Sequence, residues 1–224
     1  MVITGTCGTV TSDAVALIVQ TAPVITDQPD PVTQCQGTNV TFSVTATGTD
    51  LTYQWRKDGA DISGATASDY TINNIAPADA GSYDVVITGT CGILTSDAVT
   101  LTVQTPPVIT TQPSSITECE SNTVSFTVVA SGSGLTYQWR KNGTAIPGAI
   151  DATFTLTNIS TASAGDFDVI ITGTCGTVTS TTATLTVATA PVITVQPLGT
   201  EVCERSDVSF SVTATGTDLT YQWR

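Results

Sequence analysis

An 84-residue repeat constrains this chain more than any other feature of its sequence. The phrase TGTCG occurs at 4–8, 88–92 and 172–176, and the phrase LTYQWR occurs at 51–56, 135–140 and 219–224. A period of 84 residues is the length of a small domain and is too long for one turn of a solenoid. The recurring positions include every cysteine and every tryptophan: Cys7, Cys91 and Cys175; Cys35, Cys119 and Cys203; Trp55, Trp139 and Trp223.

Proline-containing joints divide the repeats. The joints TAPVIT, TPPVIT and TAPVIT begin at residues 21, 105 and 189. They predict complete modules at 22–105 and 106–189, preceded by the last strands of another module at 1–21 and followed by the first strands of a third at 190–224. We expect the chain to be a truncated piece of a longer array. Short linkers that carry proline couple neighbouring modules closely, which favours a rod over a globule.

The composition and the residue pattern predict an all-β fold. Threonine makes up about a fifth of the sequence, and β-branched side chains suit a pleated, half-buried surface. Within 40–46 every second residue is apolar, and the same alternation recurs in 51–55, 83–87 and 99–103. About seven such short strands around a central tryptophan predict a sandwich of two sheets.

The charged and titratable residues argue against several classes of function. The formal net charge is -13, and histidine is absent. Too few basic residues are present to neutralise a row of phosphates, so nucleic acid is not an expected partner. The absence of histidine excludes the usual catalytic triads and zinc sites. No apolar run approaches the ~20 residues of a membrane span, so we expect no membrane insertion in this segment. The chain is therefore not expected to be an enzyme.

Two kinds of site with oxygen or lysine chemistry need separate consideration. Four carboxylates lie near predicted module ends, where some adhesive arrays bind Ca²⁺, but no dense calcium-binding loop is present; they are Asp27, Asp30, Asp50 and Asp218. Solvated carboxylates are the favoured interpretation, and no cofactor is expected. A Lys–Asn isopeptide bond would require a buried lysine, but Lys57 and Lys141 both adjoin turns.

The motifs of the complete modules resemble those of a known family. The tryptophan of the third strand, the phrase YTINNI at 70–75 and the phrase DAGSY at 79–83 are similar to the immunoglobulin I-set pattern. More narrowly, the chain resembles the tandem immunoglobulin-like repeats of long bacterial surface proteins. The resemblance implies an array of immunoglobulin-like β-sandwiches and says little about function, because the fold hosts many functions.

The chain departs from the vertebrate immunoglobulin pattern at its core. The resemblance implies two core cysteines beside the tryptophan, but valines stand at both positions. We therefore expect the core to be held by apolar packing. The predicted core residues are Trp55, Val44, Val85 and Tyr83 in the first module, and Trp139, Val128, Val169 and Phe167 in the second. Phe167 replaces the tyrosine whose hydroxyl would form a hydrogen bond.

Six regularly spaced cysteines in a histidine-free chain indicate disulfides. Cys35 lies near the base of its module and Cys91 at the top, roughly 30 Å apart by strand length, whereas a disulfide needs Cα atoms within about 7 Å. A bond from Cys35 to Cys175 across the joint is the favoured prediction. The remaining cysteines, Cys7, Cys91, Cys119 and Cys203, would then pair with modules outside the chain or with other copies. Pairing within a module and free thiols remain open alternatives.

Near-identical modules and short joints favour a structural role. We expect a spacer segment of an extracellular or cell-surface stalk, adhesin or filament, with other immunoglobulin-like modules as partners, either in the same chain or through end-to-end association of copies. The alternative is a module that binds a protein or glycan on a surface through the loops at one end of each sandwich. Binding loops usually differ between modules, but the loop ATGTDL at 46–51 recurs unchanged at 214–219, which favours the spacer.

Overall fold

The structure, a computed structural model, describes residues 1–224. The chain divides into two compact units, Met1–Val103 and Gln104–Arg224, and each is described here by itself. The backbone is almost entirely extended, and the only helical segments are the 3-10 turns η1 (Pro77–Asp79) and η2 (Thr161–Ser163). No helix in the structure has both the length and the apolar character needed to cross a membrane.

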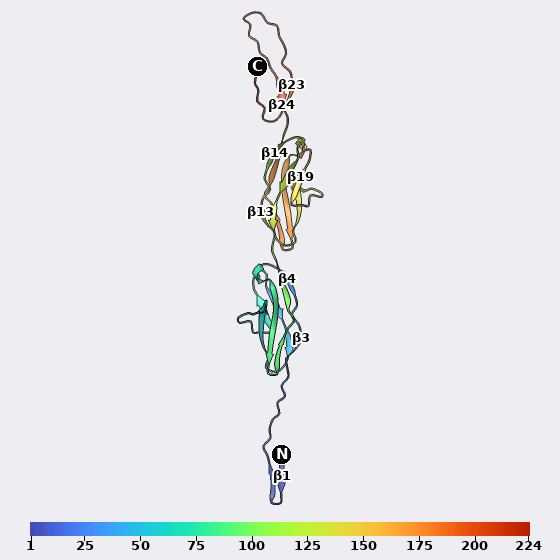
Figure 1. Ribbon diagram of the computed structural model, residues 1–224. Helices are drawn as coiled ribbons and strands as arrows, with labels where there is room; N and C mark the ends of the chain where they lie inside the picture. The colour runs from blue at the N-terminus through green and yellow to red at the C-terminus, as the bar shows by residue number, and fades with distance from the viewer. The chain divides into compact units, whose positions relative to one another are not determined.

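The first unit contains one complete sandwich, with strands drawn in blue to green in Figure 1. Its strands follow the predicted alternation, so that apolar side chains point into the space between the two sheets. They are β3 (Val24–Asp27), β4 (Val32–Cys35), β5 (Val40–Ser43), β6 (Thr45–Thr47), β7 (Thr52–Lys57), β8 (Ala60–Asp61), β9 (Asp69–Ile72), β10 (Gly81–Gly89), β11 (Gly92–Thr95) and β12 (Val99–Gln104).

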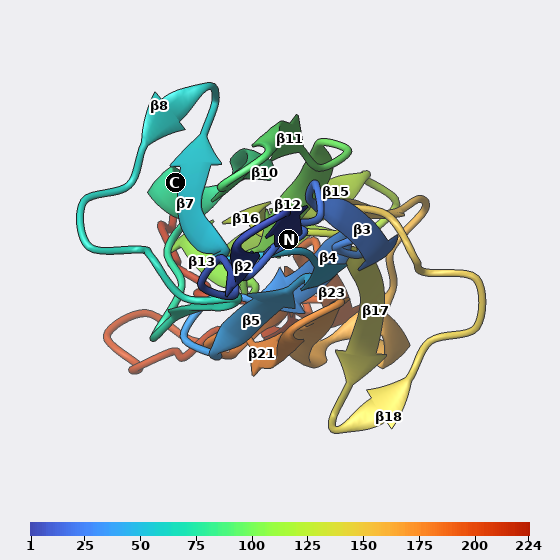
Figure 2. The ribbon, with the colours of Figure 1, turned by 90° about the horizontal axis from the view of Figure 1, so that it is seen from below.

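The larger sheet has the order β4-β12-β10-β7-β8, with β11 also paired to β10. Strands β10 and β7 are antiparallel and place Val85 opposite Trp55. The loop that follows β8 leaves the edge of this sheet (Figure 2) and returns the chain to the opposite layer. There β5 pairs with β9, and β3 pairs with β6.

The first strand of the sandwich is divided between the two sheets. Its first half, β3, pairs with β6, and its second half, β4, lies beside β12 in the larger sheet. Pro29 and Pro31 stand between the halves. Since proline has no N–H to donate to a ladder, the chain leaves one sheet here and joins the other.

The single strand predicted at 40–46 is likewise two segments, because β5 and β6 have different partners. At the junction Val44 donates its N–H to the carbonyl of Ser68 at 3.1 Å. The alternation nevertheless continues through the junction, since Val40, Phe42 and Val44 are all buried. The hydrophobic pattern predicted the faces of this strand but not the change of partner.

The core of the first sandwich joins both sheets. It is built around stacked and tilted aromatic rings: Phe42 stacks on Tyr83 with ring centroids 4.9 Å apart, and Phe42 and Trp55 lie 6.1 Å apart. Offset aromatic pairs of this kind add to the stabilisation from buried apolar area. The buried members are Val40, Phe42, Val44, Trp55, Ala65, Ile75, Tyr83, Val85, Ile87, Val99 and Leu101.

The second unit contains a second sandwich with the same order of elements. Its larger sheet runs β14-β22-β20-β17-β18 with β21 also paired to β20, and the edge strand β14 is parallel to β22. The strands are β13 (Val108–Thr111), β14 (Ile116–Cys119), β15 (Val124–Thr127), β16 (Val129–Ser131), β17 (Thr136–Lys141), β18 (Thr144–Ala145), β19 (Thr153–Leu156), β20 (Gly165–Gly173), β21 (Gly176–Thr179) and β22 (Ala183–Ala188). The predicted all-β fold of tandem sandwiches is confirmed.

Each unit also includes a short two-stranded piece. In the first unit β1 (Val2–Gly5) and β2 (Gly8–Thr11) form a hairpin, and in the second unit β23 (Val192–Val195) pairs with β24 (Thr213–Thr215). These pieces lack the enclosed core of the sandwiches: Trp223 is 53% exposed, whereas Trp139 in the same LTYQWR phrase is 0% exposed. The phrase therefore buries its tryptophan only where a second sheet covers it.

Candidate functional site

The centre of each sandwich is a tryptophan enclosed by two valines. Trp55, Val44 and Val85 are all buried, and Trp55 donates its indole N–H to the carbonyl of Ala67 at 3.0 Å. This hydrogen bond satisfies the one polar atom of the ring and fixes the loop that links the two sheets. The centre is thus held by packing and by this one bond.

The second sandwich repeats this arrangement. Trp139, Val128 and Val169 are buried, and the indole N–H of Trp139 donates to the carbonyl of Asp151 at 2.9 Å. Tyr83 and Phe167 occupy equivalent buried positions in the two sandwiches. All eight residues proposed as core from the sequence therefore lie in the two interiors.

A tyrosine corner is present in the first sandwich alone. Tyr83 donates its hydroxyl to the carbonyl of Asp79 at 2.7 Å, and burial raises the pKa of Tyr83 to about 12. Phe167 has no hydroxyl and cannot form this bond. The preceding 3-10 turn is closed in both sandwiches: Asp79 accepts the N–H of Ala76 at 2.8 Å, and the hydroxyl of Ser163 accepts the N–H of Ser160 at 3.1 Å.

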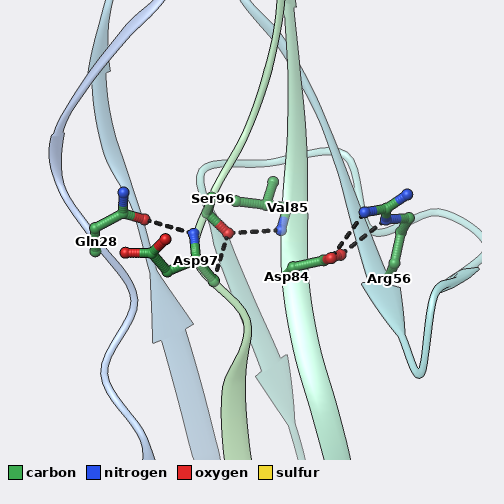
Figure 3. A network of polar contacts seen from close by, with 6 residues as sticks. All are labelled: Gln28, Arg56, Asp84, Val85, Ser96 and Asp97. Atoms are coloured by element: carbon green, nitrogen blue, oxygen red, sulfur yellow. Dashed lines mark hydrogen bonds and ion pairs between the residues drawn. The ribbon is translucent and has the colours of Figure 1, made fainter.

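A buried serine links strand β10 to the start of β12, as Figure 3 shows. The Oγ of Ser96 accepts the main-chain N–H of Val85 at 3.0 Å and donates to the carbonyl of Asp97 at 3.0 Å. Ser180 forms the equivalent bonds with Val169 and Thr181. Ser96 and Ser180 are the only buried polar or charged residues of the chain, and each satisfies a main-chain donor that would otherwise be buried alone.

A glutamine ties the divided first strand to this network. The Oε1 of Gln28, just after β3, accepts the N–H of Asp97 at 3.0 Å, and Gln112 accepts the N–H of Thr181 at 2.9 Å. The position follows from the chain path, since the first strand passes the start of the last strand where it changes sheets. Sequence analysis missed this network, although Ser12, Ser96 and Ser180 recur at the 84-residue period.

An ion pair crosses the outer face of the larger sheet beside this network (Figure 3). Arg56 on β7 donates from Nε and Nη2 to the two carboxylate oxygens of Asp84 on β10, at 2.8 and 2.7 Å. These hydrogen bonds raise the pKa of Arg56 above its ordinary value. Arg140 and Asp168 form the same bidentate pair in the second sandwich. The sequence analysis did not predict this ion pair.

The turn after β7 differs between the sandwiches in a matched way. In the first, the carboxylate of Asp58 accepts the N–H of Ser82 at 2.9 Å. In the second, the amide oxygen of Asn142 accepts the N–H of Asp166 at 2.9 Å. In the second sandwich the donor residue, Asp166, is itself charged, and its acceptor Asn142 is neutral. Two carboxylates are therefore not brought together at this turn.

The cysteines fall into two chemical states. Cys35 and Cys175 are disulfide-bonded, whereas Cys7, Cys91, Cys119 and Cys203 are exposed free thiols. Cys35 ends β4 and Cys119 ends β14, so these two occupy the same position in successive modules. The chain thus contains a disulfide, and cysteines at equivalent positions differ in oxidation state.

The carboxylates considered for Ca²⁺ do not converge. Asp27, Asp30, Asp50 and Asp218 are all exposed, and no group of three or more His, Cys, Asp or Glu residues is placed to hold a metal ion. The two lysines have other partners: Lys57 donates to the carbonyl of Ala78, and Lys141 donates to that of Ala162 at 2.6 Å. Each lysine therefore caps the turn before β10 or β20.

Comparison with known proteins identifies the fold. The family model of the immunoglobulin domain matches residues 22–88. Among solved structures, the titin I-band fragment I67-I69 has a TM-score of 0.69 at 22% identity, covering 90% of this chain and 77% of its own. Sidekick-1 immunoglobulin domains 1–4 have a TM-score of 0.61 at 21% identity, covering 77% and 50%.

Two curated proteins match parts of the chain more closely in sequence. Endoglucanase C of Cellulomonas fimi is 32% identical over 120 residues, which are 51% of this chain and 11% of the endoglucanase. The decoration protein of Escherichia phage T5 is 40% identical over 76 residues, which are 33% of this chain and 46% of the phage protein. The chain thus spans less than half the length of either curated relative.

Proposed function

Because this chain is a tandem of immunoglobulin-like domains, we propose that it is a structural spacer of an extracellular stalk, adhesin or filament and has no catalytic role. The main support is that the two complete domains repeat their internal contacts almost bond for bond. Bidentate pairs, buried serines and indole hydrogen bonds recur 84 residues apart. A segment whose purpose is length needs identical units, whereas recognition needs different loops.

The disulfide supplies the second element of the proposal. We assign the bond to the pair Cys35–Cys175, because these two cysteines are disulfide-bonded and the other four are thiols. They belong to different modules, so such a bond restricts bending at the joint. Restricting a joint in this way suits a part that carries load, and a disulfide persists in oxidising surroundings outside the cell.

The curated relatives support the interpretation that this kind of module occurs as a part of different proteins. The matched stretch is 11% of an endoglucanase and 46% of a phage decoration protein, and function belongs to sites rather than to folds. We propose that the partners of this segment are further immunoglobulin-like modules, in the same chain or in other copies. The alternative function is binding of a protein or glycan through the loops at one end of each sandwich. The experiments below would detect such binding.

Thiol counting and peptide mapping test the disulfide. In denaturant without reductant, we expect four reactive thiols per chain, and six after reduction. A non-reducing peptide map should contain a peptide joining Cys35 to Cys175. A peptide joining Cys35 to Cys91 would refute the assignment. The double variant Cys35→Ser, Cys175→Ser provides the matched control, and its small-angle scattering should indicate a more flexible joint.

Two further measurements test the spacer itself. The chain should release no reducing ends from carboxymethylcellulose, the substrate type suggested by the name of its endoglucanase relative. It should also show no specific ligand in glycan and protein arrays. A ligand bound with micromolar affinity and lost on mutation of loop residues would replace the spacer with the binding function.

A further inference from the structure

We propose that Arg205 is the one position at which an endopeptidase that cleaves after arginine or lysine can cut the folded chain, and that the two domains shield the other internal basic residues. The chain has six basic residues in all. Four of them occupy one place in the fold, the adjacent pair at the end of strands β7 and β17. They are Arg56, Lys57, Arg140 and Lys141; the others are Arg205 and Arg224.

The two arginines of these pairs are held on both sides. Strand β7 is an inner strand, with β10 on one side and β8 on the other. The guanidinium of Arg56 is also engaged by both oxygens of Asp84. A protease must take several residues around the cut into its own cleft in extended form. Doing so here requires removing an inner strand from the larger sheet, which amounts to unfolding the domain.

The lysines are held against the first residues of β10 and β20. Lys57 donates to the carbonyl of Ala78, and the next residue, Asp58, donates its N–H to the carbonyl of Ser82 at 2.8 Å. A Cβ built on Gly81 would lie 2.9 Å from the Cε of Lys57. The lysine stem is thus packed tightly against the backbone, and the bond after Lys57 lies in a turn fixed from both ends.

The second domain repeats this protection. Asn142 donates its N–H to the carbonyl of Asp166 at 2.7 Å, and Lys141 donates to the carbonyl of Ala162 at 2.6 Å. The aliphatic stem of Lys141 also lies tightly against Gly165, because a Cβ there would meet its Cε at 3.0 Å. Both cleavable bonds of this pair are therefore fixed as in the first domain.

Arg205 has none of these restraints. It is exposed and sits in a turn with a positive φ of 72°, closed by a bond from the N–H of Ser206 to the carbonyl of Cys203 at 3.1 Å. The equivalent residues of the complete domains, Gly37 and Ser121, are also exposed and have φ values of 89° and 68°. Of these three residues, Ser121 and Arg205 carry a side chain and both are exposed, and exposed turns are where proteases cut.

The reaction is hydrolysis of the bond between Arg205 and Ser206. One water molecule is consumed, Arg205 gains a carboxylate, and Ser206 gains an amino group. In the two domains, cleavage depends on the small population that is unfolded at equilibrium. With ordinary domain stabilities, this population makes cleavage after the four shielded residues at least about 1000-fold slower than after Arg205.

Limited digestion of the whole folded chain with trypsin tests the proposal, with fragments identified by mass spectrometry. We expect one early product that ends at Arg205, and cuts at 56, 57, 140 and 141 only after denaturation. Arg205→Lys should retain the early cut, and Arg205→Ser, which copies Ser121, should abolish it. Cleavage at any shielded position within tenfold of the rate at Arg205, or no preferential cut at Arg205, would overturn the proposal.

Discussion

The hydroxyl of Ser96 accepts the main-chain N–H of Val85 at 3.0 Å, and Val85 lies opposite Trp55 on the neighbouring strand. Val85 stands where the immunoglobulin I-set pattern implies a core cysteine. Each domain therefore lacks the covalent link between its sheets. Instead, the main chain of strand β10 donates a hydrogen bond to a buried serine, which fixes this part of the strand to the start of the last strand. Four experiments follow from this and related contacts.

Replacing Ser96 with alanine should leave the N–H of Val85 buried and without an acceptor. Unsatisfied buried donors cost about 1–3 kcal/mol, so we expect a loss of that size in the free energy of unfolding, measured by urea denaturation. Ser180→Ala should have the same effect on the second domain. Thr100→Ala, at an exposed position on β12, should change stability by less than about 0.5 kcal/mol. Equal effects of Ser96→Ala and Thr100→Ala would contradict the prediction.

The tyrosine corner predicts that removing the hydroxyl from the first domain and adding one to the second should change stability in opposite directions. Tyr83→Phe removes the bond to the carbonyl of Asp79 and should cost about 0.5–1.5 kcal/mol. Phe167→Tyr places a hydroxyl at the equivalent position and should stabilise the second domain by a similar amount. Calorimetry of both variants, with the double variant as a check on additivity, measures these changes. Two changes of the same sign would contradict this account.

Alkaline pH should destabilise the first domain through Tyr83. Its pKa rises from about 10 in the unfolded chain to about 12 in the folded domain because of burial. Between these values the folded state binds more protons than the unfolded state, so stability decreases as pH rises, by about 3 kcal/mol in total. Below pH 10 this contribution is fully present. Comparing unfolding of the parent chain and of Tyr83→Phe from pH 9 to 12 isolates it, because only the parent should show the added slope.

Alanine substitutions at two glycines of the first domain distinguish the cost of steric crowding from the cost of an unfavourable backbone conformation. Gly81 has φ +156°, and a Cβ there would lie 2.9 Å from the carboxylate of Asp58; Gly59 has φ +81°, with nothing within 4 Å of its Cβ position. Both alanine variants carry a backbone cost of about 1–2 kcal/mol. Gly81→Ala should cost more, because the side chains of Asp58 and Lys57 must also move away from the new Cβ. Chemical denaturation that ranked Gly59→Ala as equally harmful would contradict the steric argument.

The sequence allowed prediction of those parts of the structure that depend on periodicity. Alternation placed Phe42, Val44 and Trp55 on inward faces, and the structure buries all three. The 84-residue period predicted two complete sandwiches of the same fold. Both inferences need only local patterns and their recurrence, which a single sequence contains.

Contacts between strands distant in sequence were not predictable in the same way. The bond from Asp97 to Gln28 spans 69 residues and exists because the first strand changes sheets beside the last one. The change of partner at Val44 similarly depends on which strand lies alongside. Recurrence of Ser96 and Gln28 at the repeat period marks these residues as constrained, but a polar residue in a Thr-rich chain gives no sign of what it contacts.

The matched turns after β7 and β17 also limit how such repeats can be shuffled. In one domain Asp58 accepts the N–H of Ser82, and in the other Asn142 accepts the N–H of Asp166. A gene crossover between the two positions, with the first domain upstream, yields a hybrid that places the carboxylate of Asp58 beside that of Asp166. The reciprocal hybrid joins Asn142 to Ser82 and creates no repulsion. Of the two hybrids, the second is therefore expected to have the more stable turn.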